Sequence, residues 1–244
     1  MSAYEFIADL SIPLKFGGAQ PNAFGVDSAA AKMLGDTRDG ASVNFEQYTF
    51  IPHCNGTHTE CIGHITDERI SLRDCLKDIV MYALLVSAHP VKNESGEALI
   101  TKEALENAGV QPPATAGGSD SLIIRTLPNS DSKQSQAYGG DNIPPYFTAE
   151  AMRYIGECGF KHLLVDLPSI DRMFDEGKLE NHRIFWNVEP GSRSVGPQTR
   201  INSTVTELIY VPAEIEDGEY LLNLQIAPFE ADAAPSRPVL LRLT

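Results

Sequence analysis

The fold and the function of this chain depend on one stretch of sequence, Cys54-Asn55-Gly56-Thr57-His58-Thr59-Glu60-Cys61-Ile62-Gly63-His64. It brings a thiol, two imidazoles and a carboxylate close together. On an extended strand alternate side chains point to one face, so Cys54, His58 and Glu60 would lie side by side. Zinc accepts these ligand types, and a catalytic zinc keeps one position for water beside three protein ligands. The spacing therefore predicts a metal site formed by Cys54, His58 and Glu60.

Two alternative interpretations fit the same residues. Histidine and cysteine are ordinary core residues, and Gly56-Thr57 is also typical of a simple turn. A closed structural zinc site would use four ligands and do no chemistry. Its ligands would be Cys54, His58, Cys61 and His64. The intervals between these four residues match no common zinc finger, so we favour the catalytic site.

Length and charge limit the classes of protein to consider. The chain has 244 residues, which is enough to bury a large core, and we expect one domain spanning residues 1–244. It carries 33 acidic and 19 basic residues, and its net charge of −14 repels phosphate backbones and anionic membrane surfaces. Nucleic acid and membranes are therefore not expected partners.

Cysteine usage and the amino terminus indicate the compartment. The four cysteines, at positions 54, 61, 75 and 158, form no Cys-x-x-Cys pair, which favours a reducing environment. The amino terminus lacks a basic region followed by an apolar run, and no segment approaches about 18 consecutive apolar residues. We therefore expect a cytoplasmic protein.

Short runs rich in branched and aromatic residues recur along the chain and predict β-strands. They cover residues 4–14, 43–51, 79–87, 122–126, 162–166, 205–211, 220–227 and 239–243. Helical patterns are fewer. Many strands with few helices indicate a mixed α/β (α+β) fold, with a central mixed β-sheet.

Helices and loops are predicted between these strands. Helical patterns cover residues 71–77 and 101–108, and a third helix begins after Thr148 and stops at Gly159. Three stretches without apolar periodicity are expected to be loops: residues 110–120, 128–145 and 189–203. The second is long for a compact domain, so it is either a mobile connection or a lid over a site.

Further motifs extend the pattern beyond the first stretch. The chain opens with Asp9-Leu10-Ser11-Ile12-Pro13, continues with Leu122-Ile123-Ile124-Arg125-Thr126, and later reads Leu163-Leu164-Val165-Asp166-Leu167-Pro168-Ser169-Ile170-Asp171. In this order the segments resemble the cyclase-like family of metal-dependent hydrolases, which includes bacterial kynurenine formamidases and isatin hydrolases. The family signature, His-x-Gly-Thr-His-x-Asp-x-Pro-x-His, aligns with residues 54–64. His182 and Glu207 match a later histidine and a glutamate on a late strand, so the resemblance covers most of the chain.

This chain differs from the signature at two of the predicted metal ligands. Cys54 stands at the first histidine and Glu60 at the aspartate. A thiolate reaches less far from the backbone than an imidazole, and glutamate reaches further than aspartate, so the two changes compensate each other. Alternatively His53, one residue out of register, replaces Cys54 through a bulge at Gly56. The alternation of side chains along a strand favours Cys54.

The resemblance implies hydrolysis of an amide-type bond in a small aromatic substrate, a formamide or a cyclic amide. It implies a divalent metal ion held by Cys54, His58 and Glu60, with zinc favoured over manganese because of the sulfur. His64 would take a proton from water and return it to the leaving nitrogen. In two-metal relatives the equivalents of Glu60, His64, His182 and Glu207 form a second site. His182 and Glu207 could instead orient the ligands, and the predicted catalytic residues are His64 and Glu207.

A second hypothesis comes from another functional class. The altered signature would then belong to a catalytically inactive relative that has lost its metal and binds a small molecule in the same pocket. For either hypothesis the resemblance implies a small-molecule substrate or ligand. It also implies a homo-oligomer, since relatives commonly form homodimers or larger assemblies.

Overall fold

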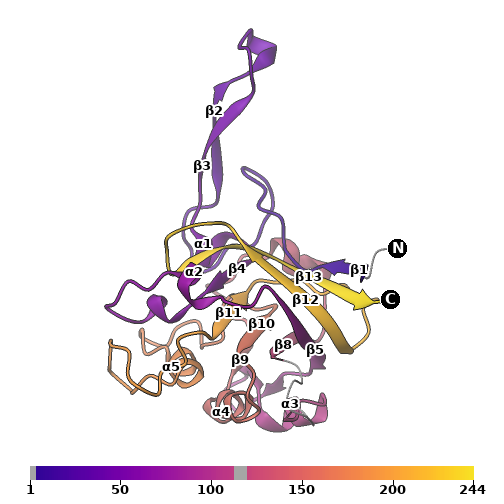
Figure 1. The fold of residues 1–244 in the computed structure, drawn as a ribbon, viewed down its shortest axis with the longest axis vertical. Helices are drawn as coiled ribbons and strands as arrows, with labels where there is room; N and C mark the ends of the chain where they lie inside the picture. Colours follow the sequence, from indigo (N-terminus) through magenta and orange to yellow (C-terminus); the bar gives the residue numbers. More distant parts are fainter. Residues whose placement is uncertain (1–3, 113–119) are drawn as a thin grey trace.

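A mixed eight-stranded sheet forms the body of the protein, in a computed structural model that describes residues 4–112 and 120–244 (Figure 1). Its strands, in order of hydrogen-bonded neighbours, are β1 (Tyr4–Asp9), β13 (Ala233–Leu243), β12 (Gly218–Ile226), β5 (Val80–Ala88), β8 (Ser121–Thr126), β10 (His162–Val165), β11 (Thr204–Glu207) and β4 (His58–Glu60). The pairings from β5 through β8 and β10 to β11 are parallel. The remaining pairings are antiparallel. The predicted mixed sheet with few helices is confirmed.

The sheet closes on itself because β4 is paired along both edges. It runs antiparallel to β11 on one side and to β13 on the other. His58 consequently lies opposite Glu207 in β11 and opposite Pro235 in β13. β1 joins β13 outside this closed ring. A strand of only three residues therefore fixes the distance between the two ends of the sheet.

The centre of the sheet explains the continuous apolar runs in the sequence. Residues 122–124 in β8 and 163–165 in β10 are all 0% exposed. Unbroken runs of this kind are typical of parallel strands that are covered on both faces. One hydrophobic core extends from Ala8 in β1 to Leu240 in β13.

Helices α2 (Leu72–Cys75), α3 (Lys102–Asn107) and α4 (Ala149–Glu157) begin where the sequence places good N-caps. The side chain of Thr101 accepts from the backbone of Ala104 at the start of α3. Thr148 does the same for α4, and Gly159 follows with a φ of 85°. Ser71 caps α2. The side-chain oxygens satisfy backbone amides that have no partner inside the helix, so these three predictions hold.

Several other strands and helices were not predicted from the sequence. Among the described residues they are β2 (Ala30–Gly35), α1 (Pro52–Asn55), β6 (Val91–Lys92), β7 (Ala98–Ile100), β9 (Tyr146–Phe147) and α5 (Glu180–Trp186). The last of these packs against α4. β6, β7 and β9 form a separate small sheet.

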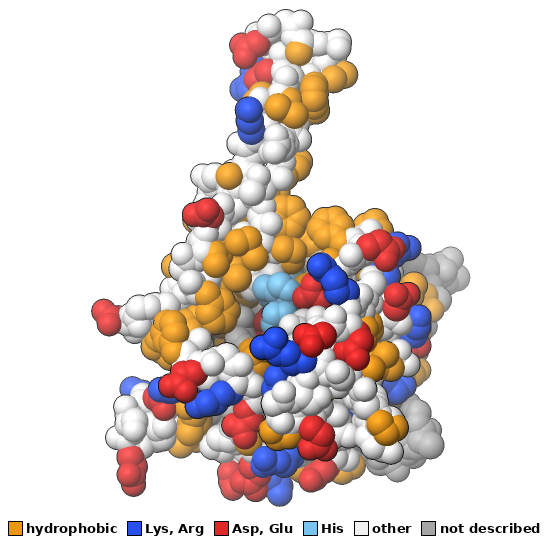
Figure 2. All heavy atoms as spheres, turned by 90° about the vertical axis from the view of Figure 1, so that its left-hand side faces the viewer, with side chains coloured by type: hydrophobic (Ala, Val, Ile, Leu, Met, Phe, Trp, Pro, Cys, Tyr) orange, Lys and Arg blue, Asp and Glu red, His pale blue; other side chains and the backbone are white. Residues whose placement is uncertain are grey.

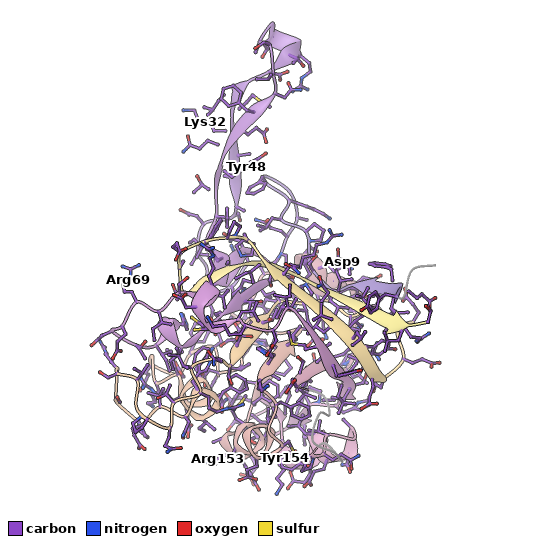
Figure 3. The ribbon with its side chains drawn as sticks, in the orientation of Figure 1. Asp9, Lys32, Tyr48, Arg69, Arg153 and Tyr154 are labelled. Atoms are coloured by element: carbon purple, nitrogen blue, oxygen red, sulfur yellow. The ribbon has the colours of Figure 1, made fainter. Side chains whose placement is uncertain are left out.

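A two-stranded arm projects from the body. It consists of β2 and β3 (Phe45–Thr49), which within the described part of the chain pair only with each other (Figure 1). Lys32 and Tyr48 mark its two strands in Figure 3. The chain runs from β3 directly into α1 and then into β4.

The predicted loops are largely as expected. Residues 128–145 contain one short 3₁₀ helix, η3 (Asp131–Ser135). From it the Lys133 ammonium donates to the carbonyl of Thr126 at 2.6 Å and to Asp166 at 2.8 Å, which anchors this connection to the ends of β8 and β10. Residues 189–203 contain no helix or strand, and the loop predicted at 110–120 lies partly outside the described residues. No helix of the described chain is long and apolar enough to cross a membrane.

The central position of β10 gives a test of the core. Leu163 is 0% exposed and lies between β8 and β11, so Leu163→Ala should lower the free energy of unfolding by about 2–5 kcal/mol. Urea denaturation followed by circular dichroism measures the change. Leu243→Ala is the matched control, because Leu243 in β13 is 54% exposed, and it should change the stability by less than about 0.5 kcal/mol. Equal effects of the two substitutions would contradict the assigned core.

Candidate metal centre

The pairing of β4 with β11 brings the first three site residues together. His58 and Glu60 alternate onto one face of β4, and Glu207 ends β11 opposite His58. All three are buried, with 3% exposure or less. His58 Nε2 lies 3.6 Å from Glu207 Oε2. The backbone amide of Ile170 donates to Glu207 Oε1 at 2.9 Å and holds this glutamate in place.

The His58 ring presents a lone pair to these carboxylates. Its Nδ1 lies 3.0 Å from the carbonyl oxygen of Gly56. A carbonyl can only accept, so Nδ1 carries the ring proton and Nε2 is free to bind a cation. The Nε2 atom is buried and has no hydrogen-bond partner among the described residues. A buried nitrogen that faces a carboxylate at this distance requires a proton or a metal ion between the two groups.

His182 reaches the same carboxylates from α5. Its Nε2 lies 2.7 Å from Glu60 Oε1 and 3.8 Å from Glu207 Oε1. Its Nδ1 contacts Asp171 Oδ2 at 2.5 Å, and the other Asp171 oxygen accepts from the backbone of Asn181. Asp171 therefore caps the amino end of α5 and also orients the histidine, an arrangement common behind metal ligands.

The prediction of an extended backbone at Cys54 is wrong. Residues Pro52–Asn55 form one helical turn, α1, and β4 begins only at His58. Pro52 is at the first helical position, where its missing N–H is not needed. His53, rather than Cys54, turns toward Glu60, and its Nδ1 lies 2.9 Å from Glu60 Oε2.

Cys54 instead belongs to a small apolar cluster. It packs with Ala23, Tyr138, Met173 and Leu208. Burial and the nearby Glu207 carboxylate raise the pKa of its thiol to about 11. Tyr138, from the loop 128–145, is 6% exposed and packs in this cluster.

His64 stands at the exposed edge of the site. It ends the 3₁₀ helix η2 (Ile62–His64), and its side chain is 27% exposed. Gly63 is required here, because a Cβ would clash with the carbonyl oxygen of Ile70. His64 Nε2 lies 3.9 Å from Glu60 Oε2, and its Nδ1 lies 3.5 Å from Asp232 Oδ2. Asp232 also contacts His53 Nε2 at 3.0 Å.

The buried carboxylates of this site require positive charge beside them. Burial opposes a charge on Glu60, but the charges of His64 and His182 outweigh it and hold the Glu60 pKa well below its usual value. Burial likewise opposes a charge on His182, yet Glu60 and Asp171 raise its pKa well above normal. Hydrogen bonds to Asp232 and Glu60 overcome the burial of His53 and raise its pKa to about 10. The buried carboxylates are thus stable only beside cations, either imidazolium groups or a metal ion.

The donor set fits a divalent metal ion. Among residues 4–112 and 120–244, three groups of side chains have ligand atoms within 4.8 Å of one another. They are His53, His58 and Glu60; Glu60, His182 and Glu207; and His53, His64 and Asp232. Imidazole and carboxylate are ligands of zinc and manganese. The four ligands of the structural-zinc alternative do not gather, since Cys61 is fully buried with its sulfur 3.5 Å from the carbonyl oxygen of Ile70.

The structure therefore brings together most of the predicted site residues. His58, Glu60, His64, His182 and Glu207 converge, and Cys54 does not. Asp232 was missed, because no motif marks an aspartate just ahead of the last strand. Asp171 was noted only as part of a motif, and its contact with His182 depends on how α5 packs.

Comparison with known proteins identifies the class. Residues 8–172 match the family model described as putative cyclase, so the chain belongs to the cyclase family. A kynurenine formamidase of Bacillus cereus is 25% identical over 203 residues, which are 83% of this chain and 82% of that protein. The kynurenine formamidase of Bacillus anthracis is 24% identical over 210 residues, or 86% and 85% of the two chains.

Solved structures share the fold. A predicted metal-dependent hydrolase from Bacillus stearothermophilus superposes with a TM-score of 0.65 at 17% identity, covering 98% of this chain and 99% of that one. Isatin hydrolase A from Labrenzia aggregata, bound to benzyl benzoate, superposes with a TM-score of 0.65 at 12% identity. The match covers 99% of this chain and 95% of that one. Kynurenine formamidases and isatin hydrolases are amide hydrolases of this family, so the predicted enzyme class is confirmed.

The contact between Asp171 and His182 yields a prediction about metal affinity. Asp171→Asn should weaken zinc binding by about 10–100-fold, because the amide orients the imidazole less well than the carboxylate does. Competition with a chromogenic chelator measures the affinity. Asp141→Asn, at an exposed aspartate of the loop 128–145, is the control and should leave the affinity unchanged. Unchanged binding in Asp171→Asn would show that His182 is not held by this bond.

Proposed function

We propose that this chain hydrolyses an amide-type bond, in a formamide or a cyclic amide, of a small aromatic substrate. The proposal includes a divalent metal ion, zinc or manganese, as cofactor. Relatives that are kynurenine formamidases and neighbours that are isatin hydrolases support this reaction type. We expect the enzyme to act in the cytoplasm, where its four free cysteines remain reduced.

The observation that carries the proposal is the lone pair of His58. Its Nε2 is fixed by the bond from Nδ1 to Gly56, is buried, and faces Glu207 without a proton donor from the described residues between them. Glu60 offers a ligand atom within 4.8 Å of that of His58, and His182 Nε2 contacts Glu60 at 2.7 Å. Two groups of ligand atoms that share Glu60 would hold the cation, one with His53 and His58 and one with His182 and Glu207. The cation would supply Lewis acidity that makes water more acidic and polarises a carbonyl oxygen.

The roles of the remaining groups follow from their exposure. His64 is an imidazole near Glu60 that is also open to solvent, so it would accept a proton from water and return it to the leaving nitrogen. Glu207 would act beside Glu60 as the second carboxylate of the centre, fixed by the amide of Ile170. Asp171 is 4% exposed and contacts His182 Nδ1, so it would orient His182.

An apolar surface beside the imidazoles would receive the aryl group. Figure 2 shows the histidine surface bordered by hydrophobic side chains below the arm. The rings of Phe50 and Phe229 lie 6.2 Å apart, and Ile51 and Phe229 are each 39% exposed. Aromatic rings pack favourably against such surfaces. Trp186 is 0% exposed and packs against His182, with the two ring centroids 5.3 Å apart, so it offers no surface to a substrate.

Metal analysis followed by one substitution tests the function. Protein purified without added metal should carry zinc or manganese at near-stoichiometric occupancy, and it should cleave members of a panel of aryl formamides and cyclic amides. Glu60→Gln should abolish hydrolysis while the chain stays folded, because it removes the carboxylate shared by two of the ligand groups. Glu230→Gln, at a surface glutamate paired with Arg73, should retain activity. A folded protein that binds no metal but still binds small aromatic compounds would instead support the inactive-relative hypothesis.

We also propose that the protein is a homo-oligomer joined through its arm. An isolated two-stranded hairpin is marginally stable in water. The arm nevertheless exposes apolar side chains, with Leu34 at 51%, Val43 at 57% and Phe45 at 53%. The apolar surface below the arm lies on the same chain, so a two-fold axis could bury both surfaces at once.

The oligomeric state gives a direct test. Light scattering after size exclusion should report at least a dimer for the natural sequence and a smaller species for the double variant Leu34→Ser, Val43→Ser. Val91→Ser is the control, since Val91 is 53% exposed in β6, away from the arm. A monomeric natural protein at micromolar concentration would refute the arm-mediated assembly.

A further inference from the structure

The helical turn α1 carries both His53 and Cys54, and Cys54 stands where the family signature has its first histidine. Along α1 successive side chains point in different directions, so His53 and Cys54 cannot both face Glu60. The imidazole of His53 lies 2.9 Å from Glu60, and the sulfur of Cys54 lies in the apolar cluster with Tyr138. The ring centroids of His53 and His58 are 5.3 Å apart, so the two rings border the same space.

Asp232 determines how the His53 ring is presented. Its Oδ2 contacts His53 Nε2 at 3.0 Å. A carboxylate only accepts, so Nε2 donates a proton to Asp232. Nδ1 faces the Glu60 carboxylate at 2.9 Å, and a cation bound there would take the place of the Nδ1 proton. The same oxygen lies 3.5 Å from His64 Nδ1. One carboxylate therefore faces both of the partly exposed imidazoles.

The backbone fixes Asp232 independently of its side chain. Asp232 immediately precedes β13, and Ala233 lies opposite Glu60 in the pairing of β13 with β4. The carbonyl of Asp232 accepts from the amide of Cys61 at 3.0 Å. The carboxylate is thus held at a constant distance from β4, as a positioning group requires.

We propose that Asp232 is a positioning residue, which orients His53 so that His53 and not Cys54 binds the metal ion with His58 and Glu60. The proposal rests on the metal-dependent function proposed above. It explains how the chain keeps an imidazole beside His58 and Glu60 although Cys54 occupies the position of the first histidine in the family signature. Asp232 is an acceptor here rather than a ligand of a separate ion, because a His53 ring that gives its Nδ1 lone pair to a metal ion keeps a proton on Nε2 for Asp232 to accept.

Cobalt substitution distinguishes the two candidate ligands without relying on activity. The cobalt(II) form of the natural protein should show d–d absorption and no thiolate-to-cobalt charge-transfer band, and Cys54→Ala should leave its spectrum and its metal affinity unchanged. Asp232→Asn should weaken zinc binding by about 10–100-fold in chelator competition. Glu230→Gln, two residues away on the surface, is the matched control and should bind as the natural protein does.

The outcomes separate this inference from the proposed function. A thiolate band in the natural protein, or loss of cobalt in Cys54→Ala, would overturn the assignment of His53 and leave the metal-dependent hydrolase standing. Unchanged zinc affinity in folded Asp232→Asn would overturn the role of Asp232. The spectrum of the natural protein decides the ligand even where a variant fails to fold. Absence of any metal binding would refute the proposed function and, with it, this inference.

Discussion

The two-sided pairing of β4 is the constraint on which the rest of the structure depends. Its three residues hydrogen-bond to β11 and β13, and this pairing closes the sheet. Thr57, just before it, strengthens the junction, because its hydroxyl accepts from the amide of Ile12 and donates to the carbonyl of Leu208. The strand that closes the fold is also the one that carries His58 and Glu60. Loss of the pairing would therefore remove the site and the architecture together.

Charge balance is the second condition on this site. Glu60 and Glu207 are buried where a single unpaired carboxylate would be strongly unfavourable, so the surrounding imidazoles or a cation must compensate them. The expected preference for zinc depended on the sulfur of Cys54. With that sulfur in an apolar cluster, the remaining nitrogen and oxygen donors suit both zinc and manganese.

The sequence predicted those parts of the molecule that depend on local pattern. Thr101 and Thr148 cap their helices, the apolar runs of β8 and β10 are buried strands, and alternation along β4 groups His58 with Glu60. The same alternation failed at Cys54, because Pro52 starts a helical turn that interrupts the strand. The contacts of Asp232 depend on long-range strand pairing, which one sequence does not reveal.

The order in which the strands leave the ribosome has a consequence for the centre. β4 is made early, yet both of its neighbours come from the last fifth of the chain, at residues 204–207 and 233–243. His58 and Glu60 thus emerge long before the strands that pair with β4 and bring the other groups of the site to them. Contacts of such long sequence separation form slowly. The nascent protein therefore presents scattered, weak donors for most of its synthesis, and tight capture of a cation is postponed until translation is nearly complete.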